Sequence, residues 1–177
     1  YPKDLGCLFL GKGAARIDKR FGRCVTVDEA LAHVKKCREA GLVHLIGRNK
    51  IDAVVFDTGR KEDLMSICSC CPCCCLWKML PELSPHISRG ITKMPGVSVT
   101  VTDACTGCSH CVESATCFVG AIHISDGKAA IDQEMCRGCG RCVESCPSSA
   151  VSLRIDDAAF VSRSVECIEP LVDIRKE

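Results

Sequence analysis

The sequence predicts an α+β fold, in which a small N-terminal α/β region with a cysteine-rich segment precedes a domain built from two similar halves related by a pseudo-twofold axis. Three observations support this prediction. A strong helix pattern followed by short apolar runs fills the N-terminal region. Six cysteines crowd into residues 68–75, and two cysteine runs of nearly equal spacing occupy residues 105–146.

The clearest helix in the sequence begins at Thr26. Thr26 and Glu29 form the S/T-x-x-E pattern of a capping box, and apolar residues then recur at helical spacing until Gly41, which suits a C-cap. Two short apolar runs follow, at Leu42–Ile46 and Ile51–Phe56, and both predict strands. We expect the apolar face of the helix to pack on these two strands.

The cysteine-rich segment comes next along the chain. Its six thiols are Cys68, Cys70, Cys71, Cys73, Cys74 and Cys75. Packing does not explain them, because apolar cores use aliphatic residues and clustered free thiols invite oxidation. Three interpretations stay open: a third iron–sulfur or other soft-metal site, a thiol–disulfide redox site, and a structural or incomplete site. Pro72 suits a bend here, and a helix is predicted from there toward Leu80.

Two runs of cysteines dominate residues 105–146. The first run is Cys105, Cys108, Cys111 and Cys117, and the second is Cys136, Cys139, Cys142 and Cys146. A short loop with a cysteine at every third position can wrap three corners of a metal–sulfur cube while its backbone N–H groups point at the sulfurs. Glycine suits such a tight loop and stands at the same place in both runs, as Gly107 and Gly138.

An internal repeat accompanies the cysteines. The sequence Cys-Val-Glu-Ser occurs at 111–114 and again at 142–145. Four residues after the last cysteine of each run stands an alanine, Ala121 or Ala150, and alternating apolar residues follow both. The repeat predicts two similar half-modules.

The second run and the Pro147 that follows it read C-x2-C-x2-C-x3-C-P. From about Val97 to Ile155 the chain resembles the bacterial-type two-cluster ferredoxin domain. It departs from that family in two extra residues, 115 and 116, and in Phe118 where the second run has a proline. In this family the fourth cysteine of each run ligates the other run's cluster.

The resemblance therefore implies two 4Fe-4S clusters with exchanged ligands. It assigns the first cluster to Cys105, Cys108, Cys111 and Cys146. It assigns the second cluster to Cys136, Cys139, Cys142 and Cys117.

The order of elements also resembles a family of poorly characterised cysteine-rich 4Fe-4S dicluster proteins. The resemblance rests on the helix, on Gly-Leu-Val-His44, on the cysteines of residues 68–75 and on the C-terminal module. In that family further cysteines lie upstream of the position where this sequence begins. The resemblance thus implies that the cysteine-rich segment shares its ligand set with preceding residues.

The sequence predicts four parts: residues 1–83, the N-terminal cysteine-rich α/β region; 84–96, a linker with prolines and serines; 97–155, the two-cluster domain; and 156–177, a tail without a motif. Within the two-cluster domain, the alternating run Val97–Thr102 should pair with Val151–Ile155. Ser125-Asp-Gly-Lys128 should join Ile122–Ile124 to Ala129–Ile131 as a hairpin.

Composition narrows the class of protein. Eighteen cysteines without any signal sequence, in metal-binding spacing, predict a reducing compartment, which we interpret as the cytoplasm. The longest uncharged run, Leu64–Trp77, is too short for a membrane span. A formal net charge of +1 does not suggest nucleic acid as a partner.

These observations predict an iron–sulfur electron-transfer protein with two 4Fe-4S clusters, serving as a carrier or subunit of a larger oxidoreductase that acts as its redox partner. The alternative is an oxidoreductase in which the two clusters feed a third metal or thiol redox centre at Cys68–Cys75. A redox sensor or metal-trafficking protein is a third class. A carrier or subunit is predicted ahead of a stand-alone enzyme, and the sequence identifies no catalytic residue.

Overall fold

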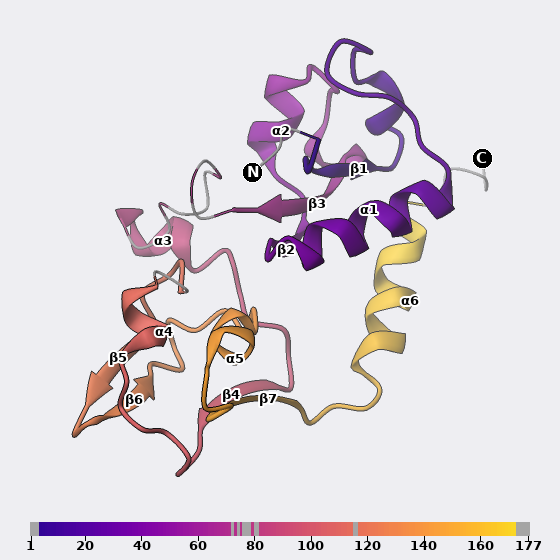
Figure 1. Ribbon diagram of the computed structural model, residues 1–177. Coiled ribbons are helices and arrows are strands. Elements are labelled where there is room, and N and C mark those ends of the chain that lie inside the picture. The colour runs from indigo at the N-terminus through magenta and orange to yellow at the C-terminus, as the bar shows by residue number, and fades with distance from the viewer. Residues whose placement is uncertain are drawn as a thin grey trace. The chain divides into compact units, whose positions relative to one another are not determined.

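Short strands and short helices follow each other along the chain, which fits the predicted α+β class (Figure 1). The computed structural model describes residues 4–71, 73, 75, 79, 82–114 and 117–172. These residues fall into two units. One takes the residues up to Cys70 together with those from Val161 onward, and the other takes Cys71–Phe160. Each unit is described by itself.

The first unit is built on a three-stranded antiparallel sheet in the order β1-β3-β2. Its elements are β1 (Leu8–Leu10), the 3-10 turn η1 (Ala14–Arg16), α1 (Val27–Glu39), β2 (Val43–Gly47), α2 (Lys50–Val55), the 3-10 turn η2 (Lys61–Asp63), β3 (Met65–Cys70) and most of α6 (Phe160–Val172). The middle strand, β3, contains the first two thiols of the cysteine-rich segment.

The predicted start of helix α1 is confirmed. Glu29 N–H donates to Thr26 Oγ1 at 3.2 Å, and Thr26 N–H donates to the Glu29 carboxylate at 2.8 Å, which completes the capping box. The helix ends just before Gly41, whose φ of 76° suits glycine.

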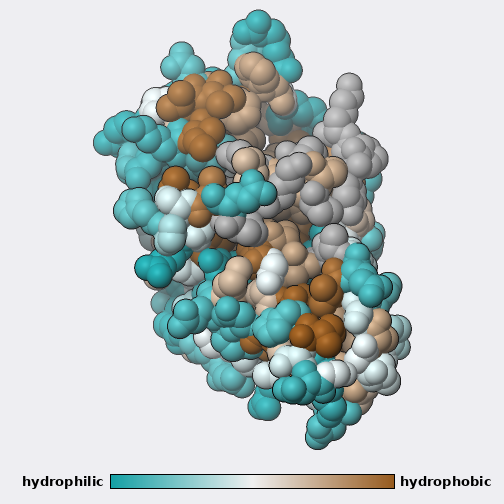
Figure 2. Space-filling view, turned by 90° about the vertical axis from the view of Figure 1, so that its left-hand side faces the viewer, coloured by the Kyte–Doolittle hydropathy of each residue, from teal (hydrophilic) through white to brown (hydrophobic). Residues whose placement is uncertain are grey.

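The predicted packing of α1 is wrong for part of its apolar face. Cys37 is fully buried, but Val27 and Leu31 are 75% and 64% exposed. The helix contacts β2, an edge strand of a narrow sheet, which covers only a strip of the helix surface. Apolar side chains also reach the surface elsewhere, as the brown regions among hydrophilic residues in Figure 2 show.

The strand predicted at Ile51–Phe56 is also wrong, because this segment forms the helix α2. The Asn49 side chain accepts a hydrogen bond from Ile51 N–H at 2.8 Å and so caps the first turn. The cap and the packing of Ala53, which is 3% exposed, outweigh the strand propensity of Ile51 and the two valines. The sheet takes its other two strands from β1 and β3, where no strand was predicted.

The second unit contains two separate antiparallel strand pairs. Its elements are α3 (Pro85–Ser88), β4 (Val97–Val101), α4 (His110–Glu113), β5 (Ile122–Ser125), β6 (Lys128–Ile131), α5 (Arg141–Ser145) and β7 (Val151–Ile155). Strand β4 pairs with β7, with Val99 opposite Leu153, and β5 pairs with β6 as a hairpin. Both pairings confirm the predictions.

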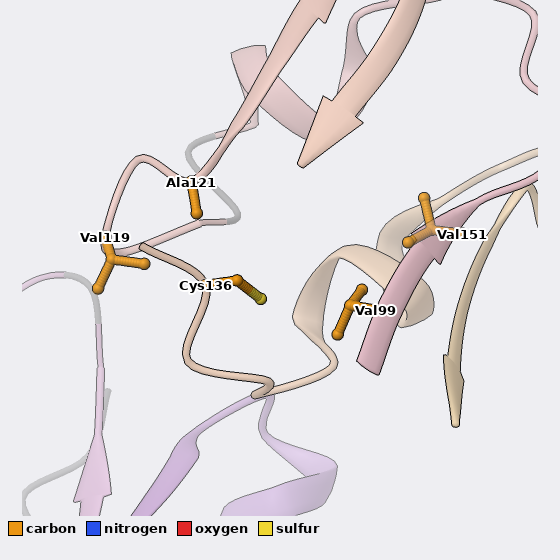
Figure 3. Packing of buried hydrophobic residues seen from close by; sticks show 5 residues of the cluster. All are labelled: Val99, Val119, Ala121, Cys136 and Val151. Carbon is orange, nitrogen blue, oxygen red and sulfur yellow. The ribbon is translucent and has the colours of Figure 1, made fainter. Parts of the chain in front are cut away.

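A small core lies between these strands and the cysteine loops. It consists of Val99, Val119, Ala121, Cys136 and Val151, each no more than 9% exposed (Figure 3). The side chain of Cys136 points toward Val99 in this view. The second cysteine loop is therefore anchored directly to strand β4 by packing.

Some predictions fall on residues that the structure does not describe. The helix predicted after Pro72 lies largely outside the described residues. The two extra residues, 115 and 116, lie wholly outside them. Residues 160–172, expected to belong to a tail without a motif, form the helix α6. None of the helices in the described ranges combines the length and apolar character needed to cross a membrane.

Candidate functional site

The eight cysteines of the two runs line two separate hollows in the second unit. One encloses about 370 Å³, open solvent included, and its cysteines are Cys117, Cys136, Cys139 and Cys142. The other encloses about 300 Å³ on the same measure, and its cysteines are Cys105, Cys108, Cys111 and Cys146. We call them the Cys136 cavity and the Cys105 cavity. Each takes three cysteines from one run and its fourth from the other run.

Backbone turns aim three cysteines of each loop at one cavity. Gly107 and Gly138 have φ values of 69° and 65°, and two residues later Ser109 and Gly140 have 60° and 78°. A Cβ at Gly107 would collide with the carbonyl oxygen of Gly127. Glycine is therefore needed there both for its conformation and for the close approach of the hairpin. The short helices α4 and α5 begin directly after these turns.

The backbone after each fourth cysteine also repeats. Gly120 and Ser149, three residues after Cys117 and Cys146, have φ values of 66° and 50°. The next residue in each case, an alanine, donates its backbone N–H to the cysteine sulfur at 3.3 Å. At these positions the two halves of the unit follow a similar path, and each fourth cysteine is held by a backbone donor.

Hydrogen bonds stabilise negative charge on sulfur in the Cys105 cavity. Ala129 N–H donates to Cys105 Sγ at 3.4 Å, and this bond is the main reason why the pKa of Cys105 is lowered. The Ser148 hydroxyl lies 3.6 Å from Cys146 Sγ and is the largest cause of the lowered pKa of Cys146. Burial raises the pKa of Cys111. At two of the four thiols these hydrogen bonds favour the thiolate, which is the form that binds metal.

The Cys136 cavity contains a more strongly perturbed thiol. Gly138 N–H donates to Cys136 Sγ at 3.4 Å. Burial, followed by repulsion from the neighbouring Cys139, raises the pKa of Cys142 to about 12. Without a cation this thiol keeps its proton at neutral pH, and a metal must displace that proton to bind.

The arrangement fits a cluster better than a single ion. In the described ranges, no three side chains of metal-binding types lie close enough together to hold one ion. A 4Fe-4S cube binds its four thiolates through four different irons, so it takes sulfurs that stand further apart than the ligands of one metal. Four thiols without histidine or carboxylate are also a soft donor set, typical of iron–sulfur sites. The residues present in each cavity fit such a cube.

The structure divides the cysteine-rich segment. Cys68 and Cys70 lie buried in β3, which belongs to the first unit, whereas Cys71, Cys73 and Cys75 belong to the second. Cys73 Sγ donates to Cys71 Sγ at 3.1 Å. Cys74 lies outside the described residues. The possible third site at these six cysteines stays a prediction.

Sequence reasoning missed two residues that lie near cysteines, one beside the cysteine-rich segment and one at the Cys136 cavity. Asp52 of α2 lies near Cys68, and burial followed by the charge of Cys68 raises the pKa of this carboxyl group. No sequence signal links the two. Arg137 lines the Cys136 cavity, and its Nε is buried without a hydrogen-bond partner among the described residues. Comparison with Thr106, at the same place in the first run, is the signal that could have identified it.

Residues 129–152 match the family model of the 4Fe-4S binding domain. This segment supports a ferredoxin-type iron–sulfur domain. It contains all four cysteines of the second run, so the match supports at least one 4Fe-4S cluster in the chain. No curated protein matches the sequence.

Proposed function

We propose that the chain is an electron-transfer protein with two 4Fe-4S clusters, one in each cysteine-lined cavity, that serves a larger oxidoreductase as carrier or subunit. The observation that carries this proposal is the sorting of eight cysteines into two groups of four, with the fourth cysteine exchanged between runs. That grouping matches the ligand exchange expected of a two-cluster ferredoxin domain.

Each cluster, when bound, supplies reversible one-electron chemistry. The cysteines hold it, and the backbone N–H groups of Gly138, Ala121 and Ala150 face cysteine sulfurs. These donors stabilise the negative charge that an added electron brings. An electron arrives from a one-electron donor protein and leaves to an acceptor, and no covalent bond forms or breaks.

The exposure of one cysteine in each loop supports electron transfer to and from a partner protein. Cys108 and Cys139, the second cysteine of each run, are exposed, whereas Cys111 and Cys136 are buried. The loops therefore reach the surface at a ligand position, where a docked redox protein comes close to the site. We also propose a reducing, cytoplasmic compartment, because cysteines in metal-binding spacing have to stay reduced to hold a cluster.

The test is metal analysis of anaerobically purified protein followed by EPR after reduction. We expect about eight irons and eight sulfides per chain, with signals from two interacting spins. A chain with zinc in place of iron and sulfide would overturn the proposal. About four irons would leave one cluster and refute the two-cluster form.

A second candidate function adds a redox centre at the cysteine-rich segment. The observations that favour it are the burial of Cys68, Cys70 and Cys71 and the 3.1 Å separation of the Cys71 and Cys73 sulfurs. In that case the two clusters feed electrons to a third metal or thiol centre. Iron clearly above eight per chain, lost on replacing Cys70 and Cys71 by serine, is expected for a third cluster. Unchanged reoxidation kinetics in that double variant would count against a catalytic role.

A further inference from the structure

Arg137 follows the first cysteine of the second run and is held in place by backbone carbonyls. Its Nη1 donates to the carbonyl oxygens of Glu134 at 2.8 Å and Met135 at 2.6 Å, and its Nη2 donates to that of Ser88 at 3.3 Å. The third nitrogen, Nε, is buried without a partner among the described residues, and Arg137 is one of the residues that line the Cys136 cavity. A buried N–H without a partner is costly, which indicates a partner absent from the protein itself.

The two cavities differ in fixed positive charge. Arg137 and Arg141 both line the Cys136 cavity, and a guanidinium stays charged at every working pH. The same places in the first run are taken by Thr106 and His110. Among the described residues that line the Cys105 cavity there is no arginine or lysine.

One cation does act on the Cys105 cavity from outside its lining. Lys128 contributes to the lowered pKa of Cys105, but as the smallest of the causes. Its Nζ is paired with the exposed Asp103 carboxylate at 3.1 Å, which offsets its charge. Arg137 also has an acidic neighbour, Asp132, whose pKa its charge helps to lower. The Cys136 cavity nevertheless has two cations in its lining, and the lining of the Cys105 cavity has none among the described residues.

We propose that Arg137 donates its Nε–H to sulfur in the Cys136 cavity and thereby makes the site there the one of higher reduction potential. The proposal rests on the proposed function, because it requires a cluster in each cavity. Reduction adds one negative charge, and a cation held at the wall stabilises the reduced form more than the oxidised form. The first electron from a one-electron donor then settles at the Cys136 site, and the second goes to the Cys105 site.

Two contributions act against the guanidinium. The Ser148 hydroxyl acts on the Cys105 cavity, but a charge-assisted hydrogen bond is roughly twice as strong as a neutral one. Desolvation disfavours added charge at two cysteines of the Cys136 cavity, Cys139 and Cys142, but at only one of the Cys105 cavity, Cys111. Each run also has a glycine N–H beside its first cysteine, at Gly107 and Gly138, so this donor does not distinguish the sites. The guanidinium of Arg137 must therefore outweigh the desolvation of Cys139 and Cys142 for the proposed order of potentials to hold.

The test is a potentiometric titration of the full iron-loaded chain, followed by EPR, on the unchanged protein, Arg137→Gln and Arg154→Gln. The control Arg154 pairs with Asp156 at 3.6 Å in the same unit and lines neither cavity, so Arg154→Gln removes the same charge elsewhere. We expect two waves in the unchanged protein. Arg137→Gln should lower the midpoint of the higher wave alone, at unchanged iron content, and Arg154→Gln should move neither wave. Coincident waves, or equal effects of the two variants, would overturn the proposal.

A second variant tests the effect of the charge if Arg137→Gln does not bind a cluster in the Cys136 cavity. Thr106 is exposed, and Thr106→Arg places a guanidinium at the same position of the first loop. It should raise the lower midpoint and narrow the gap between the waves, and an unchanged gap would refute the role of charge at this position. A protein that contains no iron and sulfide would refute the proposed function itself, and so differs from each of these outcomes.

Discussion

The backbone N–H of Ala121 donates a hydrogen bond to Cys117 Sγ at 3.3 Å, four residues from the cysteine. The same bond, at the same distance, joins Ala150 to Cys146 in the second half. Both sulfurs lie on the wall of the cavity that belongs to the other cysteine run. The short segment after each run therefore holds its fourth cysteine across the boundary between the two halves, which is the geometry that the exchange of ligands requires.

The exchange of ligands can be tested by comparing single substitutions. Cys117→Ala should abolish the same EPR signal as Cys139→Ala, because both cysteines line the Cys136 cavity. Cys146→Ala should instead match Cys108→Ala, since those two line the Cys105 cavity. If Cys117→Ala gave the spectrum of Cys108→Ala, each run would ligate its own cluster and our assignment would be wrong.

Gly107→Ala should destabilise the folded chain. The left-handed conformation, with φ of 69°, costs a non-glycine residue about 1–2 kcal/mol, and the added Cβ would also collide with the Gly127 carbonyl. Denaturant unfolding should therefore show a loss larger than that conformational term. The control is Gly22→Ala, where a Cβ meets no atom within 4 Å. Equal stabilities of the two variants would contradict the close approach of the hairpin to the first loop.

Ser109→Gly should have the opposite effect. Ser109 has a φ of 60°, and the same position of the second loop is Gly140 with 78°. Relief of about 1–2 kcal/mol of conformational strain, less the larger chain entropy of glycine, predicts a net gain of up to about 1 kcal/mol in unfolding free energy. Ser98→Gly in the extended strand β4 is the control and should lose about 0.5–1 kcal/mol. A loss at Ser109 as large as that at Ser98 would show that the serine side chain contributes more than its strain.

The β5–β6 hairpin of the second unit was predictable because a local signal determines it. The turn between β5 and β6 places Asp126 and Gly127 at φ values of 50° and 74°, the left-handed pair that a two-residue hairpin turn requires. Alternation of apolar residues predicted β4 as a strand, and its pairing with β7 was predicted from the resemblance to the ferredoxin domain. The prediction of two clusters with exchanged ligands came from cysteine spacing and from the resemblance to ferredoxins, not from local conformation.

The errors in the first unit have a common physical origin. At α2, a single cap from Asn49 and the burial of Ala53 outweighed the strand propensity of the residues between and after them. At α1, helical spacing correctly predicted the helix, but the extent of its burial depends on a sheet whose narrow width the sequence does not show. Both outcomes depend on tertiary contacts, and a single sequence carries them only weakly.

Charge around the cavities was also beyond sequence reasoning. The pattern of cysteines predicts the ligands, but the role that we propose for Arg137 depends on three carbonyls that hold its guanidinium, one of them from Ser88, 49 residues away. The difference between Arg137 and Thr106 is visible in the repeat. The sequence alone does not show that Arg137 is one of the residues that line the Cys136 cavity.

Ser148→Ala should lower the reduction potential of one site only. The Ser148 Oγ lies 3.6 Å from Cys146 Sγ, and the same position after Cys117 is the apolar Val119. A hydroxyl that donates to a cysteine sulfur stabilises the reduced, more negative form, so its removal should lower the midpoint of the Cys105 site. A neutral hydrogen bond worth about 0.5–1.5 kcal/mol corresponds to a shift of roughly 20–65 mV for one electron.

The matched control for this variant is Ser152→Ala. The Ser152 hydroxyl lies 3.0 Å from Thr100 Oγ1 on the paired strand and bonds to that hydroxyl rather than to a cysteine. It should leave both midpoints unchanged. Under our assignment Ser148→Ala and Arg137→Gln shift different waves of the titration, because the two residues act on different cavities. If both variants shifted the same wave, either Cys146 or Arg137 would be assigned to the wrong site, and the spectrum of Cys146→Ala would identify which.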